Sequence, residues 1–178
     1  MGIGAVSSVT EKPGLQDVED LFCQHHELVY RTAYSILNNT ADAEDVVQSL
    51  FLRLVRRQFP PEVRTNVKGY FYRAAVNQSL DILRSRRRYE LVADVETLDV
   101  ASRSEESQFA ERLHLQLEAA LAELSPDAVH ILVLRYTHNY SDKQIAALLG
   151  ISRTAIAVRL LRSRARLKKL MRISIGEE

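Results

Sequence analysis

The sequence has little of what a disulfide-bonded, β-rich or membrane-spanning protein requires. Its single cysteine, Cys23, excludes an internal disulfide and fits a reducing cytoplasm. Glycine (6) and proline (4) are scarce, and few segments alternate with period two, so strands are not expected. No apolar run approaches the roughly 18 residues of a membrane span, and residues 1–14 lack the pattern of a secretory signal. A helical, cytoplasmic protein is therefore predicted.

Metal and cofactor chemistry also find little support. Cys23, His25 and His26 lie close together, but on one helix the three side chains cannot all face one ion, and no second ligand cluster exists elsewhere. Partly buried helix residues are the preferred interpretation. We expect no metal, no cofactor and no catalytic residue.

Charge is abundant but unevenly placed, although the formal net charge is only +1. Residues 1–50 hold eight acids, against only Lys12 and Arg31 as bases. Towards the other end no acid lies between Asp142 and Glu177. From residue 153 onward that segment carries eight basic side chains: Arg153, Arg159, Arg162, Arg164, Arg166, Lys168, Lys169 and Arg172. A solvated helix face usually mixes both signs, so a one-sided basic helix is typical of a phosphate-contacting surface.

The same segment has the spacing of a helix-turn-helix. Ser141 and Gln144 form a capping-box pattern, and Gly150 follows the last apolar residue of the first helix. Ser152 is a second N-cap candidate, and Ala146 is small where a second helix must approach. Residues 140–170 are therefore predicted to bind DNA through a helix-turn-helix. An ordinary helical hairpin with a glycine cap is the alternative.

Helical periodicity extends along most of the chain. Apolar side chains recur at helical spacing over residues 17–37, from about 40 to the Pro60–Pro61 pair, over about 66–88 and over about 109–123, and Ser125–Pro126 restarts a helix. Thr40 is the N-cap candidate of the second helix. Residues 89–108 are polar and acidic, which favours a flexible linker. We predict an all-α protein with a disordered leader (1–16), a first helical domain (17–88), a linker (89–108), a second helical domain (109–172) and a tail (173–178).

The helix expected at 66–88 has the composition of a single-stranded DNA surface. Tyr70, Phe71 and Tyr72 can stack on bases, and Asn77 and Gln78 can hydrogen-bond an extruded base. Basic side chains lie around them: Lys68, Arg73, Arg84, Arg86, Arg87 and Arg88. The alternative is that the aromatic rings form core and the arginines solvate a helix end.

An acidic cluster, residues 42–45, begins the second helix. Carboxylates at a helix N-terminus are favoured by the helix dipole, which is the simpler explanation. A docking surface for a basic protein partner is the other.

Three segments in order resemble the bacterial sigma-70 superfamily of RNA polymerase sigma factors, extracytoplasmic-function (ECF) type. ADAEDVVQSLFLRLVRR is similar to the core-binding segment of region 2, and VKGYFYRAAVNQSLDILRSRRR to its promoter-melting, minus-ten-reading segment. LAELSPDAVHILVLRYTHNYSDKQIAALLGISRTAIAVRLLRSRARLKKL is similar to region 4. The resemblance covers roughly residues 17–172.

The resemblance implies partners and a role for each segment. Region 2 would dock on the largest subunit of core RNA polymerase, and region 4 on the second-largest. Together they would recognise the minus-ten and minus-thirty-five elements of promoter DNA. An anti-sigma protein would regulate the chain. Core polymerase would be bound by Asp42, Glu44, Asp45, Val46, Val47, Gln48 and Phe51. The minus-ten element would be engaged by Lys68, Tyr70, Arg73, Asn77, Arg84, Arg86, Arg87 and Arg88. The minus-thirty-five element would be contacted by Arg153, Thr154, Ala157, Val158, Arg159 and Arg162.

The sequence departs from the family pattern at several of these positions. Ser49 stands where the family usually has Glu, and Tyr70 replaces a common Trp but keeps a stacking surface. Ala157 and Val158 stand where the family commonly has a basic residue followed by Ser, and side chains of this kind contact thymine methyls rather than hydrogen-bonding bases. Two other functions stay open: a helix-turn-helix regulator that acts as a dimer without polymerase, and a protein-interaction module that uses Ala157, Val158 and Leu161.

Overall fold

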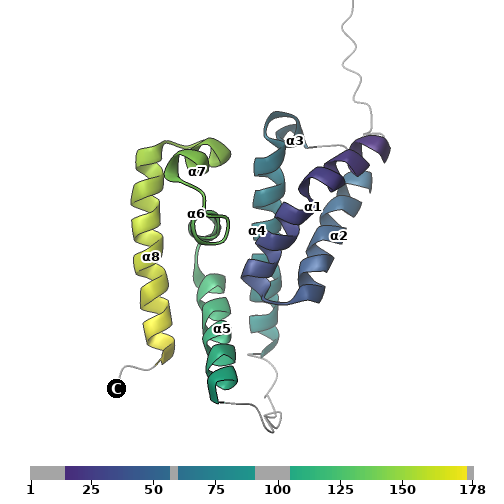
Figure 1. The fold of residues 1–178 in the computed structure, drawn as a ribbon. Coiled ribbons are helices and arrows are strands. Elements are labelled where there is room, and N and C mark those ends of the chain that lie inside the picture. The colour runs from purple at the N-terminus through teal and green to yellow at the C-terminus, as the bar shows by residue number, and fades with distance from the viewer. Residues whose placement is uncertain (1–14, 57–59, 91–104, 176–178) are drawn as a thin grey trace, which may run out of the picture.

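The computed structural model describes residues 15–56, 60–90 and 105–175, and within them every regular element is a helix. The predicted all-α class is confirmed (Figure 1). The eight helices of these ranges are α1 (Leu15–Leu37), α2 (Thr40–Arg56), α3 (Pro61–Thr65), α4 (Val67–Glu90), α5 (Glu105–Glu123), α6 (Pro126–Tyr136), α7 (Asp142–Leu149) and α8 (Arg153–Ile175).

Several predicted boundaries fall at the edges of the described ranges. Most of the expected leader, linker and tail lies outside them, at residues 1–14, 91–104 and 176–178. The helices extend into the rest: α1 begins at Leu15, α4 ends at Glu90, α5 begins at Glu105 and α8 ends at Ile175. The domain limits drawn from the sequence therefore stay predictions.

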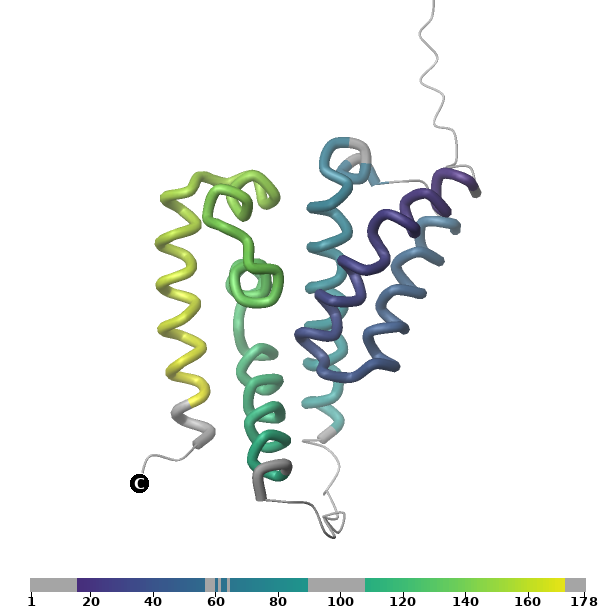
Figure 2. Tube along the Cα trace, viewed as in Figure 1, coloured from purple at the N-terminus to yellow at the C-terminus, as the bar shows by residue number. Residues whose placement is uncertain are grey.

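The first helical unit consists of α1 to α4. Helices α1 and α2 form a hairpin, and α4 packs against both (Figures 1 and 2). The turn uses Asn38, whose φ is 45°. The Asn39 Oδ1 atom accepts a hydrogen bond from the Asp42 backbone N–H at 3.1 Å. Asn39 is therefore the capping side chain and Thr40 is already helical, which corrects the predicted Thr40 cap.

A short helix, α3, was not expected from the sequence. The Pro60–Pro61 pair was predicted only to stop a helix, but Pro61 also occupies the first turn of α3, where its missing N–H costs nothing. The next helix follows at once, because the Asn66 Oδ1 atom accepts the Gly69 backbone N–H at 2.9 Å and so caps α4. A Cβ atom at Gly69 would lie 2.7 Å from Asn66 Cγ, so a larger residue there would displace the capping side chain.

The second helical unit, α5 to α8, ends in the predicted helix-turn-helix. Ser141 and Gln144 complete the capping box, and Gly150 takes the left-handed conformation with φ 73°. The Ser152 Oγ atom accepts the Ala155 N–H at 3.2 Å, which confirms the second cap. Helices α7 and α8 meet at 103°, within the range of DNA-binding helix-turn-helix pairs. Among the described residues no single helix is long and apolar enough to cross a membrane.

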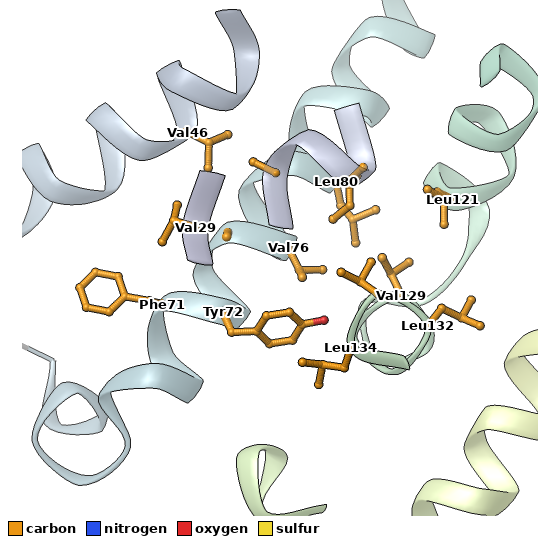
Figure 3. Close-up of a cluster of buried hydrophobic side chains, with 14 of the residues drawn as sticks. Val29, Val46, Phe71, Tyr72, Val76, Leu80, Leu121, Val129, Leu132 and Leu134 are labelled. Atoms are coloured by element: carbon orange, nitrogen blue, oxygen red, sulfur yellow. The ribbon is translucent and has the colours of Figure 1, made fainter. Parts of the chain in front are cut away.

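The two units pack against each other, with α6 lying between α4 and α8 (Figure 1). Helix α6 is buried on both sides, and Figure 3 shows the Tyr72 ring of α4 pointing at it. The Tyr72 hydroxyl donates to the His130 carbonyl at 2.6 Å, and the Tyr72 side chain is fully buried. Tyr72 was predicted as a possible base-stacking residue, and its burial excludes that in this arrangement.

The apolar period over residues 109–123 would turn Leu113 towards the second core, but the structure leaves Leu113 42% exposed. The buried positions of α5 are Ala120, Leu121 and Ala122 near its C-terminal end, and Leu124 is buried just after the helix.

Candidate nucleic-acid interface

The reading face of α8 is open to solvent. Ile156 and Leu160 pack into the core, and this orientation turns the other side of the helix outward. All six predicted minus-thirty-five residues are exposed there: Arg153, Thr154, Ala157, Val158, Arg159 and Arg162. Arg159 donates to the Asp127 carboxylate at 3.2 Å, and both side chains are well exposed, so this ion pair holds Arg159 only weakly.

The predicted minus-ten residues of α4 divide between two faces. One face lines an open groove of about 640 Å³ between α2, α3 and α4. Tyr70, Arg73 and Asn77 lie in this groove, and so does Gln78, which the sequence had also indicated as a base-contacting residue. Five further lining residues were not expected there: Ser49, Arg53, Glu62, Ala74 and Asp81. The groove thus combines an aromatic ring, two arginines, two amides and the carboxylates of Glu62 and Asp81.

A hydrogen-bond chain orients the amide of Gln78 inside this groove. The Arg53 guanidinium donates to Gln78 Oε1 at 2.9 Å, and the Gln78 NH2 group donates to the Ser49 hydroxyl. Arg53 and Ser49 are 25 and 29 residues from Gln78, so no local spacing in the sequence signals the network. Burial raises the pKa of the Tyr70 phenol, with Arg53 opposing and Glu62 adding to the shift, so Tyr70 is a neutral ring at physiological pH.

The other face of α4 contacts the second helical unit. Arg84 donates to the carbonyls of Ala122 and Leu124 at 3.1 and 3.0 Å. Arg87 donates to the Ala119 carbonyl at 3.3 Å and pairs with Glu123 at 2.7 Å. Both guanidinium groups therefore cap the C-terminal end of α5, where the helix dipole favours positive charge.

Lys68, Arg86 and Arg88 complete the predicted minus-ten set. The Lys68 ammonium lies 5.3 Å from the centre of the Tyr140 ring, a cation–π contact between the two units. Arg86 pairs with Asp42 of α2, so a predicted DNA-binding residue and a predicted polymerase-binding residue are partners. Arg88 is exposed.

The predicted polymerase-binding residues of α2 also divide by burial. Glu44, Asp45 and Gln48 are exposed, and Asp42 is half-buried beside Arg86. Val46, Val47 and Phe51 lie in the core, at 0%, 8% and 6% exposure. Their burial gives these three a packing role, so the surface that α2 offers to a partner is acidic and polar.

His130 of α6 and His138 of the turn after α6 both lie at the contact between the two helical units. The Thr32 hydroxyl donates to the Leu28 carbonyl at 2.7 Å, so the His138 Nε2–H group donates to Thr32 Oγ1 at 2.9 Å. Burial, together with the nearby cations Arg31 and Lys68, lowers the pKa of His138 to about 4. Burial also lowers the pKa of His130. Both histidines are therefore neutral in the packed arrangement.

Acid is expected to weaken this packing. His138 binds a proton with a pKa of about 4 when packed and 6.5 when free, so the free energy of packing is complete above about pH 6.5 and declines as the pH falls towards 4. The radius of gyration from X-ray scattering should increase between pH 7.5 and pH 5. His138→Gln should reduce this dependence, whereas the exposed His26→Gln should retain it. An unchanged radius for the wild type would contradict the prediction.

Comparison with known proteins identifies both helical units. The sigma-70 region 2 family model matches residues 21–89, and the sigma-70 region 4 model matches residues 114–167. The ECF RNA polymerase sigma factor SigE of Mycolicibacterium smegmatis is 29% identical over 94% of this chain and 66% of its own length. The RNA polymerase sigma factor CarQ of Myxococcus xanthus is 30% identical over 90% of this chain and 92% of its own length.

A solved structure shares the fold. The sigma factor RpoE of Bartonella quintana, solved in complex with the anti-sigma factor NepR, superposes with a TM-score of 0.51 and 21% identity, over 88% of this chain and 98% of that one. Region 2 and region 4 models match the first and second helical units in that order, and the sequence relatives are sigma factors over most of the chain. The chain therefore belongs to the sigma-70 family of RNA polymerase sigma factors, as a member of the ECF type.

Proposed function

We propose that this sigma factor binds a promoter at two places. The α4 groove binds the minus-ten element, and the exposed face of α8 binds the minus-thirty-five element. The observation that carries the proposal is the groove itself, which places a neutral aromatic ring, cations and an exposed amide around one open space. These are the groups that hold an extruded base and its backbone. The promoter is then opened by binding free energy, without covalent chemistry or cofactor.

Each group in the groove has a defined part in this proposal. The Tyr70 ring stacks on an unpaired base, and Arg73 and Arg53 neutralise phosphates beside it. The exposed Asn77 amide hydrogen-bonds a base edge. Gln78 is held by Arg53 and Ser49, so it presents a fixed wall rather than a free amide.

The α8 face supports a contact of another kind. Its reading positions include Ala157 and Val158, which have no hydrogen-bonding side chain but can touch thymine methyls. The surrounding Arg153, Arg159 and Arg162 are exposed and suit phosphates. The minus-thirty-five contact is thus dominated by backbone phosphates, groove shape and methyl groups.

Arg159→Ala is expected to flatten the salt dependence of duplex binding. Each phosphate contact contributes about 0.9 to the slope of log affinity against log salt, so losing one lowers the slope by about one unit. Asp127 competes only weakly for Arg159, because the pair is exposed. The slope is measured by fluorescence anisotropy on duplex DNA from about 50 to 300 mM salt. Arg112→Ala, an exposed arginine of α5, is the control and should keep the wild-type slope.

The acidic surface of α2 is the proposed docking site for core RNA polymerase. It is formed by Asp42, Glu44, Asp45 and Gln48, with Arg86 orienting Asp42. The related solved sigma factor is bound by an anti-sigma factor, and we propose a partner of that class here, acting in the cytoplasm on the same surfaces.

Reconstitution tests the proposed function. The purified chain is mixed with core RNA polymerase of its own bacterium and fragmented genomic DNA, and the readouts are co-migration with core and run-off transcripts. Binding to core together with specific transcripts, and permanganate-reactive thymines near the start sites, is the expected result. Duplex binding without core binding would favour a polymerase-independent regulator instead.

A further inference from the structure

Helix α8 presents a row of apolar side chains to solvent, on the side turned away from α5, α6 and α7 (Figure 1). Leu161 is 69% exposed and Val158 is 43% exposed, and Ala165 is exposed beside them. The three residues are three and four positions apart, so they form one line along the helix. Packing does not require this row, because Ile156 and Leu160 already fill the core side of α8.

We infer that this apolar row, Val158, Leu161 and Ala165, recognises methyl groups in the major groove, those of thymine and of 5-methylcytosine. The inference rests on the proposed placement of α8 at the minus-thirty-five element. It adds Leu161 and Ala165 to that site and names the chemical group that the site selects. The C5-methyl group of thymine is the apolar feature of the major-groove edges. 5-Methylcytosine carries a methyl group on the same ring carbon, so the same side chains fit it.

The row also disfavours base pairs that have no methyl group. Its side chains have neither a hydrogen-bond donor nor an acceptor. The guanine acceptors or the cytosine amino group, pressed against such side chains, would lose water without gaining a partner. A thymine or a 5-methylcytosine places its methyl group there instead. Selection therefore combines a favourable contact with methylated pyrimidines and a desolvation cost for unmethylated G·C pairs.

The length of the row corresponds to about three base pairs. From Val158 to Ala165 the helix rises about 10.5 Å, at about 1.5 Å per residue. Successive base pairs are about 3.4 Å apart. Leu161 lies about two turns from the N-terminal end of α8, the end that contacts bases in helix-turn-helix proteins. Leu161 is thus the central contact of the row as well as the largest.

Cations lie on both flanks of the row. On one flank, Arg159, Arg162 and Arg166 lie beside the start of α6. On the other, the Arg164 guanidinium lies 5.3 Å from the centre of the Tyr136 ring at the end of α6. Phosphate contacts fix the position of a helix in the groove without carrying sequence information. These cations therefore leave the choice of sequence to the apolar row between them.

DNA is the occupant that fits the charge of this face. No acid lies between Asp142 and Glu177, so a second copy of α8 would bring like charges together. An acidic protein helix would satisfy the cations as well, but its binding would not make the affinity for DNA depend on a methyl group. Sensitivity of promoter binding to single methyl groups therefore separates the two occupants.

Replacing thymidine with deoxyuridine removes only the methyl group, which makes the test direct. A promoter recovered from the run-off transcripts is resynthesised with deoxyuridine at single positions of the minus-thirty-five element. Its binding to the full chain with core RNA polymerase is measured by fluorescence anisotropy. Each deoxyuridine that faces the row should weaken binding about fourfold, the effect of one buried methyl group. Deoxyuridine in the spacer between the two elements is the control and should have no effect.

Cytosine at the same positions distinguishes the methyl group from the rest of the base. Replacing a T·A pair with C·G should weaken binding at least as much as deoxyuridine does, because the edge then lacks a methyl group and exposes an amino group. Replacing it with 5-methylcytosine paired to guanine should recover most of that loss. No recovery would contradict recognition of 5-methylcytosine.

Leu161→Ala shows whether the row is responsible. The variant removes the largest side chain of the row, and alanine keeps both the charge and the helix propensity of α8. Its loss of affinity on deoxyuridine should shrink from about fourfold to less than about twofold, because the methyl group has lost its partner. Leu115→Ala is the matched control, because Leu115 is 60% exposed on α5, and it should keep the sensitivity of the wild type.

The outcomes separate this inference from the proposed function. If wild type directs transcription but deoxyuridine in the minus-thirty-five element changes affinity by less than about twofold, methyl recognition is overturned and the proposed function stands. An element without any A·T pair would overturn it in the same way. Equal sensitivity of wild type and Leu161→Ala would assign the effect to DNA shape and reject the row. If no form of the chain binds core and promoter, the proposed function fails and this inference fails with it.

Discussion

Replacing Phe71 with alanine is expected to lower the free energy of unfolding by about 3–5 kcal/mol. Phe71 is fully buried, and its ring centre lies 5.0 Å from that of Phe51 and 5.1 Å from that of His25, so it joins α1, α2 and α4. Truncation removes both stacking contacts and leaves a cavity at the junction of three helices. A domain is commonly stable by only about 5–15 kcal/mol, so a large part of that stability would be lost.

Urea unfolding followed by circular dichroism measures the effect. Phe109→Ala is the matched control, because Phe109 is 64% exposed and the same truncation there should change stability by no more than about 0.5 kcal/mol. Since Phe71 lies only in the first helical unit, the loss should also reduce core binding while duplex binding through α8 persists. A loss below about 1 kcal/mol would show that the aromatic cluster is not the centre of this unit.

The features that the sequence predicted best are those decided by neighbours in the chain. Ser141, Gln144, Gly150 and Ser152 form their caps within three or four residues, so the helix-turn-helix could be derived from spacing and its geometry is confirmed. The same local reasoning placed the cap of α2 one residue too late, at Thr40 instead of Asn39. Asn39 and Thr40 are both good caps, and only the backbone conformation decides between them.

The contact between the units could not be derived in this way. Tyr72 and His130 are 58 residues apart, and Thr32 and His138 are 106 apart, so no periodicity relates them. A signal was present in α6, whose sequence is apolar on more than one face: Val129, Ile131, Leu132, Val133 and Leu134 are all buried. A helix that is apolar all round requires cover on more than one side, and here α4 of the first unit and α8 of the second provide it.

The sequence predicted the part of the groove that α4 forms, but not the part that α2 contributes. Tyr70, Arg73 and Asn77 lie three and four residues apart on one helix, so their common face follows from helical geometry. Arg53 and Ser49 come from α2 and reach the groove only through tertiary packing. Ser49 stands where the family usually has Glu, and the structure gives it a partner in Gln78.

Tyr70→Ala is expected to weaken promoter opening by about 5- to 150-fold, because stacking of one base on an aromatic ring contributes about 1–3 kcal/mol. The half-buried ring lies on the groove wall, and its phenol stays neutral, so the stacking surface rather than a charge carries the effect. Tyr70→Phe keeps the ring and should open promoters within about threefold of wild type. The measurement is the rate and extent of permanganate reactivity in the polymerase–promoter complex.

Two comparisons make the Tyr70 result specific to melting. Tyr34→Ala truncates a ring that is 42% exposed on α1, outside the groove, and should leave opening unchanged. Core binding and duplex binding of Tyr70→Ala should match wild type, because neither α2 nor α8 is altered. If Tyr70→Ala opened promoters normally, or if Tyr70→Phe were equally impaired, base stacking in the groove would be rejected. A defect confined to the alanine variant would assign strand opening to the ring and leave the choice of base to the exposed Asn77 amide.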